Sequence, residues 1–152
     1  MTLHTFYFFS DRNIKYPRLS RLWFFLRFIT FTHFQATLSV IVHRIRNLLG
    51  NGDLGAYVKL RLIESIVPGR SFRVNHTKRK TARKSGLHPV FEETLTYLLP
   101  PHELKMRRLE TTLCQESRIL GKTNVISRCI VCLDKIQASI NNGDDNPSFT
   151  DW

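Results

Sequence analysis

The stretch Tyr57-Val58-Lys59-Leu60-Arg61-Leu62-Ile63 alternates between apolar and basic residues over most of its length. In an extended chain successive side chains point to opposite faces, so Val58, Leu60 and Leu62 would lie on one face and the two basic residues on the other. One face therefore suits an apolar core and the other suits water. The pattern predicts a half-buried strand of a sheet that has one solvated face.

Segments of the same kind lie on both sides of this stretch. Residues 37–43 alternate in the same way, and turn-forming residues such as Gly50-Asn51-Gly52-Asp53 and Pro68-Gly69 separate the segments. We expect strands at residues 37–43, 57–63, 90–99, 109–114 and 125–133, with a last one beginning near Phe149. Short strands without a long helical period indicate an all-β fold, an antiparallel β-sandwich.

The chain of 152 residues has room for one domain of ordinary size and an extension. The composition changes near residue 36, so we expect an aromatic and basic extension over residues 1–35 and one domain over residues 36–152. The extension does not have the pattern of a signal peptide, because several basic residues precede the apolar run from Leu22 to Leu26, and this run lies unusually far from the N-terminus. Arg27 makes that run too short for a membrane span.

Two structures of the extension stay open. One is a helix lying in a membrane interface, because residues at helical spacing would form an apolar stripe beside basic residues. The other is a strand over residues 23–31, and the many aromatic and β-branched residues favour it, or a poorly ordered extension. An extension without a role is a further alternative. The stripe of the helical alternative is Leu19, Leu22, Trp23, Leu26 and Ile29.

The charge and the cysteines restrict the partners and the compartment. A net charge of +11 attracts phosphate-bearing surfaces, which are anionic membranes or nucleic acids. Three cysteines are too few for a disulfide framework and indicate a reducing, cytoplasmic compartment. Cys129 and Cys132 have the spacing of half a zinc site, but no second pair completes four ligands. We predict no metal and no cofactor.

Four spaced segments follow one another in a characteristic order. They are Leu38-Ser39-Val40-Ile41-Val42, Tyr57-Val58-Lys59-Leu60, Lys78-Arg79-Lys80-Thr81 and Leu87-His88-Pro89-Val90-Phe91-Glu92-Glu93-Thr94-Leu95. This order resembles that of C2 domains, and the resemblance covers residues 36–152. Within the family, Glu93-Thr94-Leu95-Thr96-Tyr97 is most similar to the first C2 domain of synaptotagmin-like proteins. The resemblance implies a C2-type sandwich of about seven to eight strands.

The resemblance also bears on calcium. C2 domains that bind this ion present about five carboxylates from two loops. Here Gly55-Ala56 stands where the family has aspartate-proline, and Cys114-Gln115-Glu116-Ser117-Arg118 in the second loop has one carboxylate. Asp53 and Glu116 alone would leave a divalent ion short of oxygen ligands. We therefore predict no calcium binding.

A basic segment lies between Glu64 and Glu92, where the sequence has no acidic residue. Residues 71–84 within it have few apolar side chains and predict an edge strand or an exposed loop. The resemblance implies that this strand recognises phosphoinositide headgroups or protein partners. Lysine meets phosphate as a point charge and arginine as a fork. The predicted lipid-binding residues are Arg73, Lys78, Arg79, Lys80, Arg83 and Lys84.

On an extended strand Lys78, Lys80 and Lys84 would share one face, which could meet a phosphate layer. We predict calcium-independent binding of acidic phospholipids, namely phosphatidylserine and phosphoinositides, and peripheral recruitment to membranes in vesicle trafficking or exocytosis. A protein-interaction module that uses the basic strand for an acidic partner is the alternative. Nucleic-acid binding is less favoured, because Phe72 is the single aromatic residue of residues 71–84. A solvated edge strand whose charges prevent aggregation stays open. No catalytic motif is recognised, and we predict no enzyme activity.

Overall fold

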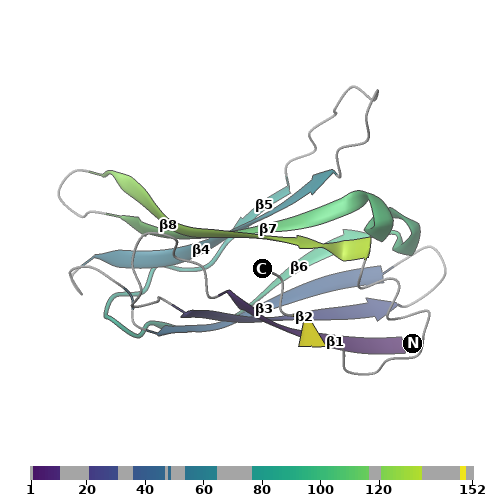
Figure 1. Cartoon of the computed structure of the whole chain (residues 1–152), viewed down its shortest axis with the longest axis horizontal. Coiled ribbons are helices and arrows are strands. Elements are labelled where there is room, and N and C mark those ends of the chain that lie inside the picture. Colours follow the sequence, from purple (N-terminus) through teal and green to yellow (C-terminus); the bar gives the residue numbers. More distant parts are fainter. Residues whose placement is uncertain are drawn as a thin grey trace.

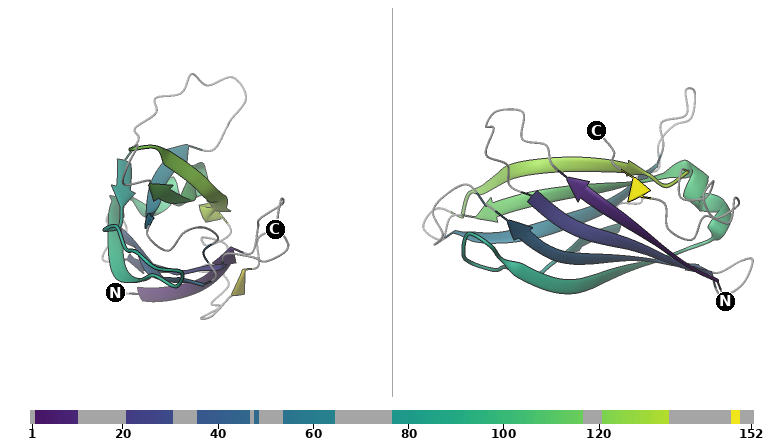
Figure 2. Two further views of the ribbon diagram at one scale, coloured as in Figure 1. Left: turned by 90° about the vertical axis from the view of Figure 1, so that its left-hand side faces the viewer. Right: turned by 60° about the horizontal axis from the view of Figure 1, so that its bottom comes forward.

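The computed structural model describes residues 2–10, 21–30, 36–46, 48, 54–64, 77–116, 121–134 and 148–149. The side chains it describes lie between Thr37 and Asp134. These residues form two stacked β-sheets, which Figure 1 shows from the side and Figure 2 shows end-on and tilted. The predicted all-β sandwich is confirmed.

A five-stranded sheet has the strand order β6-β3-β2-β1-β9, and a four-stranded sheet has the order β5-β4-β7-β8. All described pairings are antiparallel except that of β1 with β9. A 3-10 helix, η1, connects β6 to β7 across one end of the sandwich (Figure 1). The elements are β1 (Thr2–Ser10), β2 (Arg21–Thr30), β3 (Ala36–Arg46), β4 (Gly55–Glu64), β5 (Thr77–Lys80), β6 (Val90–Leu99), η1 (Pro101–Met106), β7 (Arg107–Glu116), β8 (Thr123–Cys132) and β9 (Ser148–Phe149).

The alternating segments are the strands whose inner faces form the core. The expected strand at residues 90–99 coincides with β6, and those at 37–43, 57–63, 109–114 and 125–133 correspond to β3, β4, β7 and β8. Burying an aliphatic side chain contributes about 1.5–3 kcal/mol, so the inner faces hold the two sheets together. Buried members of this core are Leu38, Val40, Val42, Val58, Leu60, Leu62, Leu109, Leu113, Val131 and Leu133.

The N-terminal residues contribute two strands to the five-stranded sheet. β2 spans most of the segment expected as a strand and pairs antiparallel with β3 from Arg21 to Thr30, so the interfacial helix is not formed there. β1 was not expected, because its sequence does not alternate, although a run of aromatic residues from Phe6 to Phe9 favours a strand. β1 pairs in parallel with β9 at two residues, which departs from the antiparallel expectation. The boundary expected at residue 36 stays a prediction.

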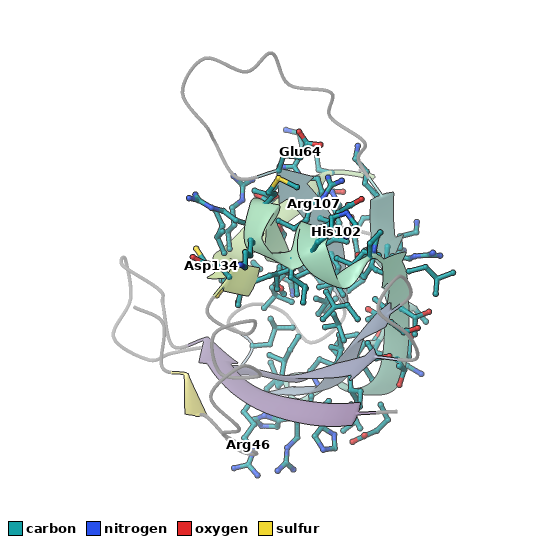
Figure 3. All side chains as sticks on the ribbon, turned by 90° about the vertical axis from the view of Figure 1, so that its right-hand side faces the viewer. Arg46, Glu64, His102, Arg107 and Asp134 are labelled. Atoms are coloured by element: carbon teal, nitrogen blue, oxygen red, sulfur yellow. The ribbon has the colours of Figure 1, made fainter. Side chains whose placement is uncertain are left out.

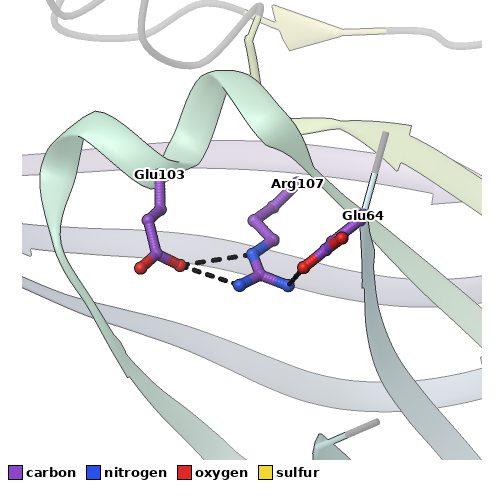
Figure 4. Close-up of polar contacts among 3 residues, drawn as sticks. All are labelled: Glu64, Glu103 and Arg107. Carbon is purple, nitrogen blue, oxygen red and sulfur yellow. Dashed lines mark hydrogen bonds and ion pairs between the residues drawn. The ribbon is translucent and has the colours of Figure 1, made fainter. Parts of the chain in front are cut away.

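The polar linker after Pro100 is ordered as η1, which a buried leucine and an ion-pair cluster attach to the sandwich. Leu104 is fully buried. Arg107, at the start of β7, donates to Glu103 of η1 at 2.9 Å and to Glu64 at the end of β4 at 3.2 Å (Figure 4). Figure 3 views this end of the molecule, with Glu64 and Arg107 on the side of the four-stranded sheet.

Among the described residues, no helix is long and apolar enough to cross a bilayer.

Candidate functional site

The basic strand β5 is an edge of the four-stranded sheet, and its register decides where its charges point. Arg79 is opposite Leu60 of β4, while Lys80 is opposite Lys59 and Lys78 is opposite Arg61. Leu60 is fully buried, so its neighbours along β4 point away from the core. Lys78 and Lys80 consequently share the outer face of the sheet with Lys59 and Arg61.

The same face continues across β7 to β8. Lys59 is opposite Thr112 of β7, and Thr112 is in turn opposite Arg128 of β8, so the three residues form one row across the sheet. We call the outer surface formed by Lys59, Arg61, Lys78, Lys80 and Arg128 the basic face. Lys78, Lys80 and Arg128 are exposed, and Lys59 and Arg61 are half-buried. The three lysine ammonium groups form no ion pair with a carboxylate in the part of the chain that the structure describes.

One carboxylate lies within the basic face. Glu110 of β7 is 5% exposed, because β7 runs between β4 and β8 and long side chains cover it from both sides. Its Oε2 accepts a hydrogen bond from Nε of Arg61 at 2.6 Å, and its Oε1 lies 3.2 Å from Nε of Arg128. A buried carboxylate requires such partners, since burial without them strongly disfavours its charged form.

Arg79 is not directed into the basic face. Its guanidinium lies over the ring of Tyr97 on β6, 5.7 Å from the ring centroid, and so connects β5 to the other sheet at the edge of the sandwich. Burial raises the pKa of the Tyr97 phenol, and the Arg79 charge opposes this in part. Arg79 therefore has a packing contact that Lys78 and Lys80 do not have.

The extended alternation ends before Arg83 and Lys84, because β5 ends at Lys80. Thr81 turns inward and is buried, and its Oγ1 accepts a hydrogen bond from the backbone N–H of Val58 at 3.0 Å. The chain pairs with β4 again at Lys84, whose backbone N–H donates to the Ala56 carbonyl at 2.9 Å and whose carbonyl accepts from the Ala56 N–H at 2.7 Å. Lys84 thus lies opposite Ala56, three residues along β4 from Lys59, the partner of Lys80. Arg73 lies outside the described residues.

Arg83 occupies the end of the sheet where the resemblance implies calcium loops. Its guanidinium forms an ion pair with Glu116 of β7, the strand partner of Gly55. A Cβ atom added at Gly55 would lie 2.0 Å from Cδ of Arg83, so the absence of a side chain there makes room for the arginine. Asp53 lies outside the described residues. Within the described part, no group of three or more His, Cys, Asp or Glu residues could hold a metal ion.

None of the three cysteines forms a disulfide. Both Cys129 and Cys132 lie on β8; Cys129 packs against the core and Cys132 is half-buried. Cys114 is fully buried on β7, and desolvation raises the pKa of its thiol, while the charge of Lys59 and a hydrogen bond from Tyr57 oppose this.

The structure adds three residues to the basic face that the predicted set did not include. Lys59 and Arg61 already stood on the solvent side of the alternating stretch that became β4, so a sequence signal for them existed. Arg128 had no such signal, because its place beside Lys59 depends on the register between β7 and β8. Of the predicted residues, the structure brings together Lys78 and Lys80 on this face.

Comparisons with known proteins agree with the architecture. The family model described as C2 domain matches residues 36–148. The solution structure of the third C2 domain of KIAA1228 protein is similar, with a TM-score of 0.56 and 21% identity over 82% of this chain and 84% of that one. C2 domain A of plant extended synaptotagmin 1 gives a TM-score of 0.50 and 19% identity over 65% of this chain and 70% of that one.

No curated protein matches the chain at a significant level. The solved structures show the shared fold, and the family model shows the family, because it spans most of the chain from β3 to β9. The resemblance derived from the four sequence segments is confirmed: the chain belongs to the C2 domain family.

Proposed function

We propose that this C2 domain binds acidic phospholipid membranes through its basic face and that it does so without calcium. C2 domains generally bind membrane lipids or proteins, which supports a binding module and no enzyme activity. The observation that carries the proposal is the cluster of Lys59, Lys78 and Lys80 on adjacent strands, side by side and without carboxylate partners among the described residues. Peripheral binding at cytoplasmic membranes in vesicle trafficking or exocytosis is part of the proposal and rests on the synaptotagmin-like resemblance.

The strength of such binding can be estimated from the number of available charges. A basic residue near an anionic leaflet contributes about 1 kcal/mol, so the three lysines contribute about 3 kcal/mol. This is enough for reversible binding and too little for permanent attachment. Phosphatidylserine and phosphoinositides are the lipids that supply the required negative charge.

Calcium independence is supported by the contacts of Arg83. Its guanidinium neutralises Glu116, the one carboxylate of the second loop, and lies beside Gly55 where the family has an acidic residue. Because Arg83 engages it, Glu116 is not available as an oxygen ligand for a divalent ion, which needs several such ligands.

Vesicle binding of the full chain tests the proposal. We expect binding to phosphatidylcholine vesicles that contain phosphatidylserine or phosphatidylinositol bisphosphate, unchanged by chelator and weaker at high salt, because salt screens exposed charges. Lys78→Gln with Lys80→Gln should reduce affinity by about 30-fold, the effect of two basic residues at the leaflet. Lys105→Gln with Lys122→Gln removes the same charge from exposed positions outside the basic face and is the matched control.

Equal losses from both pairs of substitutions would show that the basic face is not the site. Binding that disappears with chelator would contradict calcium independence. Stronger retention by duplex DNA than by acidic vesicles at matched salt would favour nucleic acid as the partner.

An acidic protein is the second candidate partner. Ile130 of β8 is 43% exposed and lies in the same row of the sheet as Arg61 and Glu110. Apolar side chains beside basic ones suit a protein surface, whose contacts combine both kinds. Capture of a protein that survives lipid extraction and is lost on charge reversal at Lys78 and Lys80 would favour this alternative.

A further inference from the structure

Glu110 is a carboxylate within the basic face, so it opposes anion binding there. It lies on β7, in the middle of the row Lys78, Arg61, Glu110 and Ile130 that crosses the four-stranded sheet. Both of its carboxylate oxygens face arginines, with Arg61 on Oε2 and Arg128 on Oε1. The two arginines come from the strands on either side of β7, so the sheet register itself creates this cluster.

Burial makes the carboxylate a strong competitor for its two arginines. Glu110 is 5% exposed, so little water reaches its carboxylate and the two guanidinium groups are its polar partners. Each arginine directs its Nε atom to the Glu110 carboxylate, which partly balances the positive charge of that arginine. A phosphate that approaches Arg61 or Arg128 also meets the negative charge beneath them, and like charges repel.

The lysines of the basic face have no such constraint. Lys78 and Lys80 belong to the edge strand, and Lys59 adjoins Lys80. The structure therefore divides the face into a lysine part over β4 and β5, where charges are available, and an arginine part over β4, β7 and β8, where they are engaged.

We propose that Glu110 acts as a built-in counter-anion that confines phosphate-bearing lipid headgroups to Lys59, Lys78 and Lys80 and holds membrane affinity below what the arginines would allow. This inference rests on the proposed function and adds the part of the face that is used and the residue that limits it. Glu110 acts through Arg61 and Arg128, so it is a positioning residue and does not touch the headgroup.

The test compares Glu110→Gln with Glu110→Asp in the full chain, using phosphatidylcholine vesicles that contain phosphatidylserine and phosphatidylinositol bisphosphate. Glu110→Gln should bind at least about fivefold more tightly, which is the effect of one additional basic residue at an anionic leaflet. It should also show a steeper loss of affinity with salt, because one more charge takes part in binding. Glu110→Asp keeps the negative charge and should bind like the wild type.

A second substitution shows whether the gain comes from the arginines. Adding Arg128→Gln to Glu110→Gln should remove most of the gain, whereas Arg128→Gln alone should reduce binding no more than Lys122→Gln, which removes a charge outside the face. Circular dichroism and thermal unfolding check that each variant is folded. If Glu110→Gln does not fold, the comparison of Arg128→Gln with Lys80→Gln tests the inference. These two residues lie in one row of the sheet, and only the loss of the lysine should weaken vesicle binding.

Folded Glu110→Gln protein that binds like the wild type, or more weakly, would overturn the inference, as would equal losses from Arg128→Gln and Lys80→Gln. These results leave the proposed function in place as long as the wild type binds acidic vesicles. A wild type that does not bind them at all would overturn the proposed function and this inference with it.

Discussion

Replacing Tyr97 by phenylalanine should stabilise this domain. Tyr97 is 2% exposed on β6, and its hydroxyl has no hydrogen-bond partner among the described residues. A buried hydroxyl without a partner costs about 1–3 kcal/mol. The stacking of Arg79 on the ring, which contributes about 0.5–1 kcal/mol at an exposed site, would be kept in the variant. We expect the free energy of unfolding to rise by about 1 kcal/mol near neutral pH.

The advantage of the variant should grow at alkaline pH. Burial raises the pKa of the Tyr97 phenol above its ordinary value of 10.0. The folded-state pKa is then higher than the unfolded-state pKa, so the stability linked to the protonated phenol is fully present below pH 10 and is lost as the pH rises above it. Phenylalanine does not titrate and does not lose this contribution. The pKa of the Cys114 thiol is also raised, but its effect cancels because both proteins contain it.

Urea unfolding followed by circular dichroism, near pH 7 and above pH 10, measures both effects. Arg79→Gln is the companion variant and should lose about 0.5–1 kcal/mol in the tyrosine and phenylalanine backgrounds alike. A loss of stability of about 1 kcal/mol or more in Tyr97→Phe at neutral pH would mean that the hydroxyl has a partner, and the reasoning would be refuted. An equal alkaline loss of stability in wild type and variant would refute the pH argument.

Three further predictions concern the start of β4, the residue after β5 and the end of β7. Gly55→Ala should lower the midpoint of thermal unfolding, because the new Cβ would clash with Cδ of Arg83, and this loss should largely disappear in an Arg83→Ala background. Thr81→Val should cost about 1 kcal/mol in urea unfolding, because the N–H of Val58 would lose its partner; no change would show that this bond does not stabilise the β4–β5 pairing. The Cys114 thiol should react with a thiol reagent far more slowly in folded than in urea-unfolded protein, since burial and a raised pKa both suppress the thiolate, and equal rates would contradict its burial.

The strands of this domain were predictable because their signal is local. The alternation in residues 57–63 places its apolar members on one face whatever the neighbouring strands are, and Val58 and Leu60 are fully buried. The run at residues 90–99 ends at Pro100, and β6 has the same bounds. β1 escaped prediction because its residues favour a strand without alternating, so no local pattern marks an inner and an outer face.

The candidate site was predictable in part. Lysines in a segment without acidic residues indicated an anion-binding strand, and Lys78 and Lys80 are exposed side by side with Lys59. The strand is shorter than the basic segment, however. Thr81 still follows the alternation by facing inward to Val58, but the next bridge pairs Lys84 with Ala56, which is one residue out of the register that pairs Lys80 with Lys59. The alternation therefore does not extend to Arg83 or Lys84, and no local pattern in the sequence marks where the register of this edge strand shifts.

What the sequence by itself determined is the set of faces: which residues of each strand point to the core, which charges point to water, and that the family is C2. Only the tertiary structure decided the partners of those charges. Arg61 and Glu110 are 49 residues apart, and Arg83 and Glu116 are 33 apart. The first pair meets because β4 and β7 align in one register, and a shift of one residue would turn every side chain to the opposite face. The second pair meets because the chain after β5 pairs Lys84 with Ala56, next to Gly55, the strand partner of Glu116. Interactions between distant strands thus separate the available lysines from the engaged arginines.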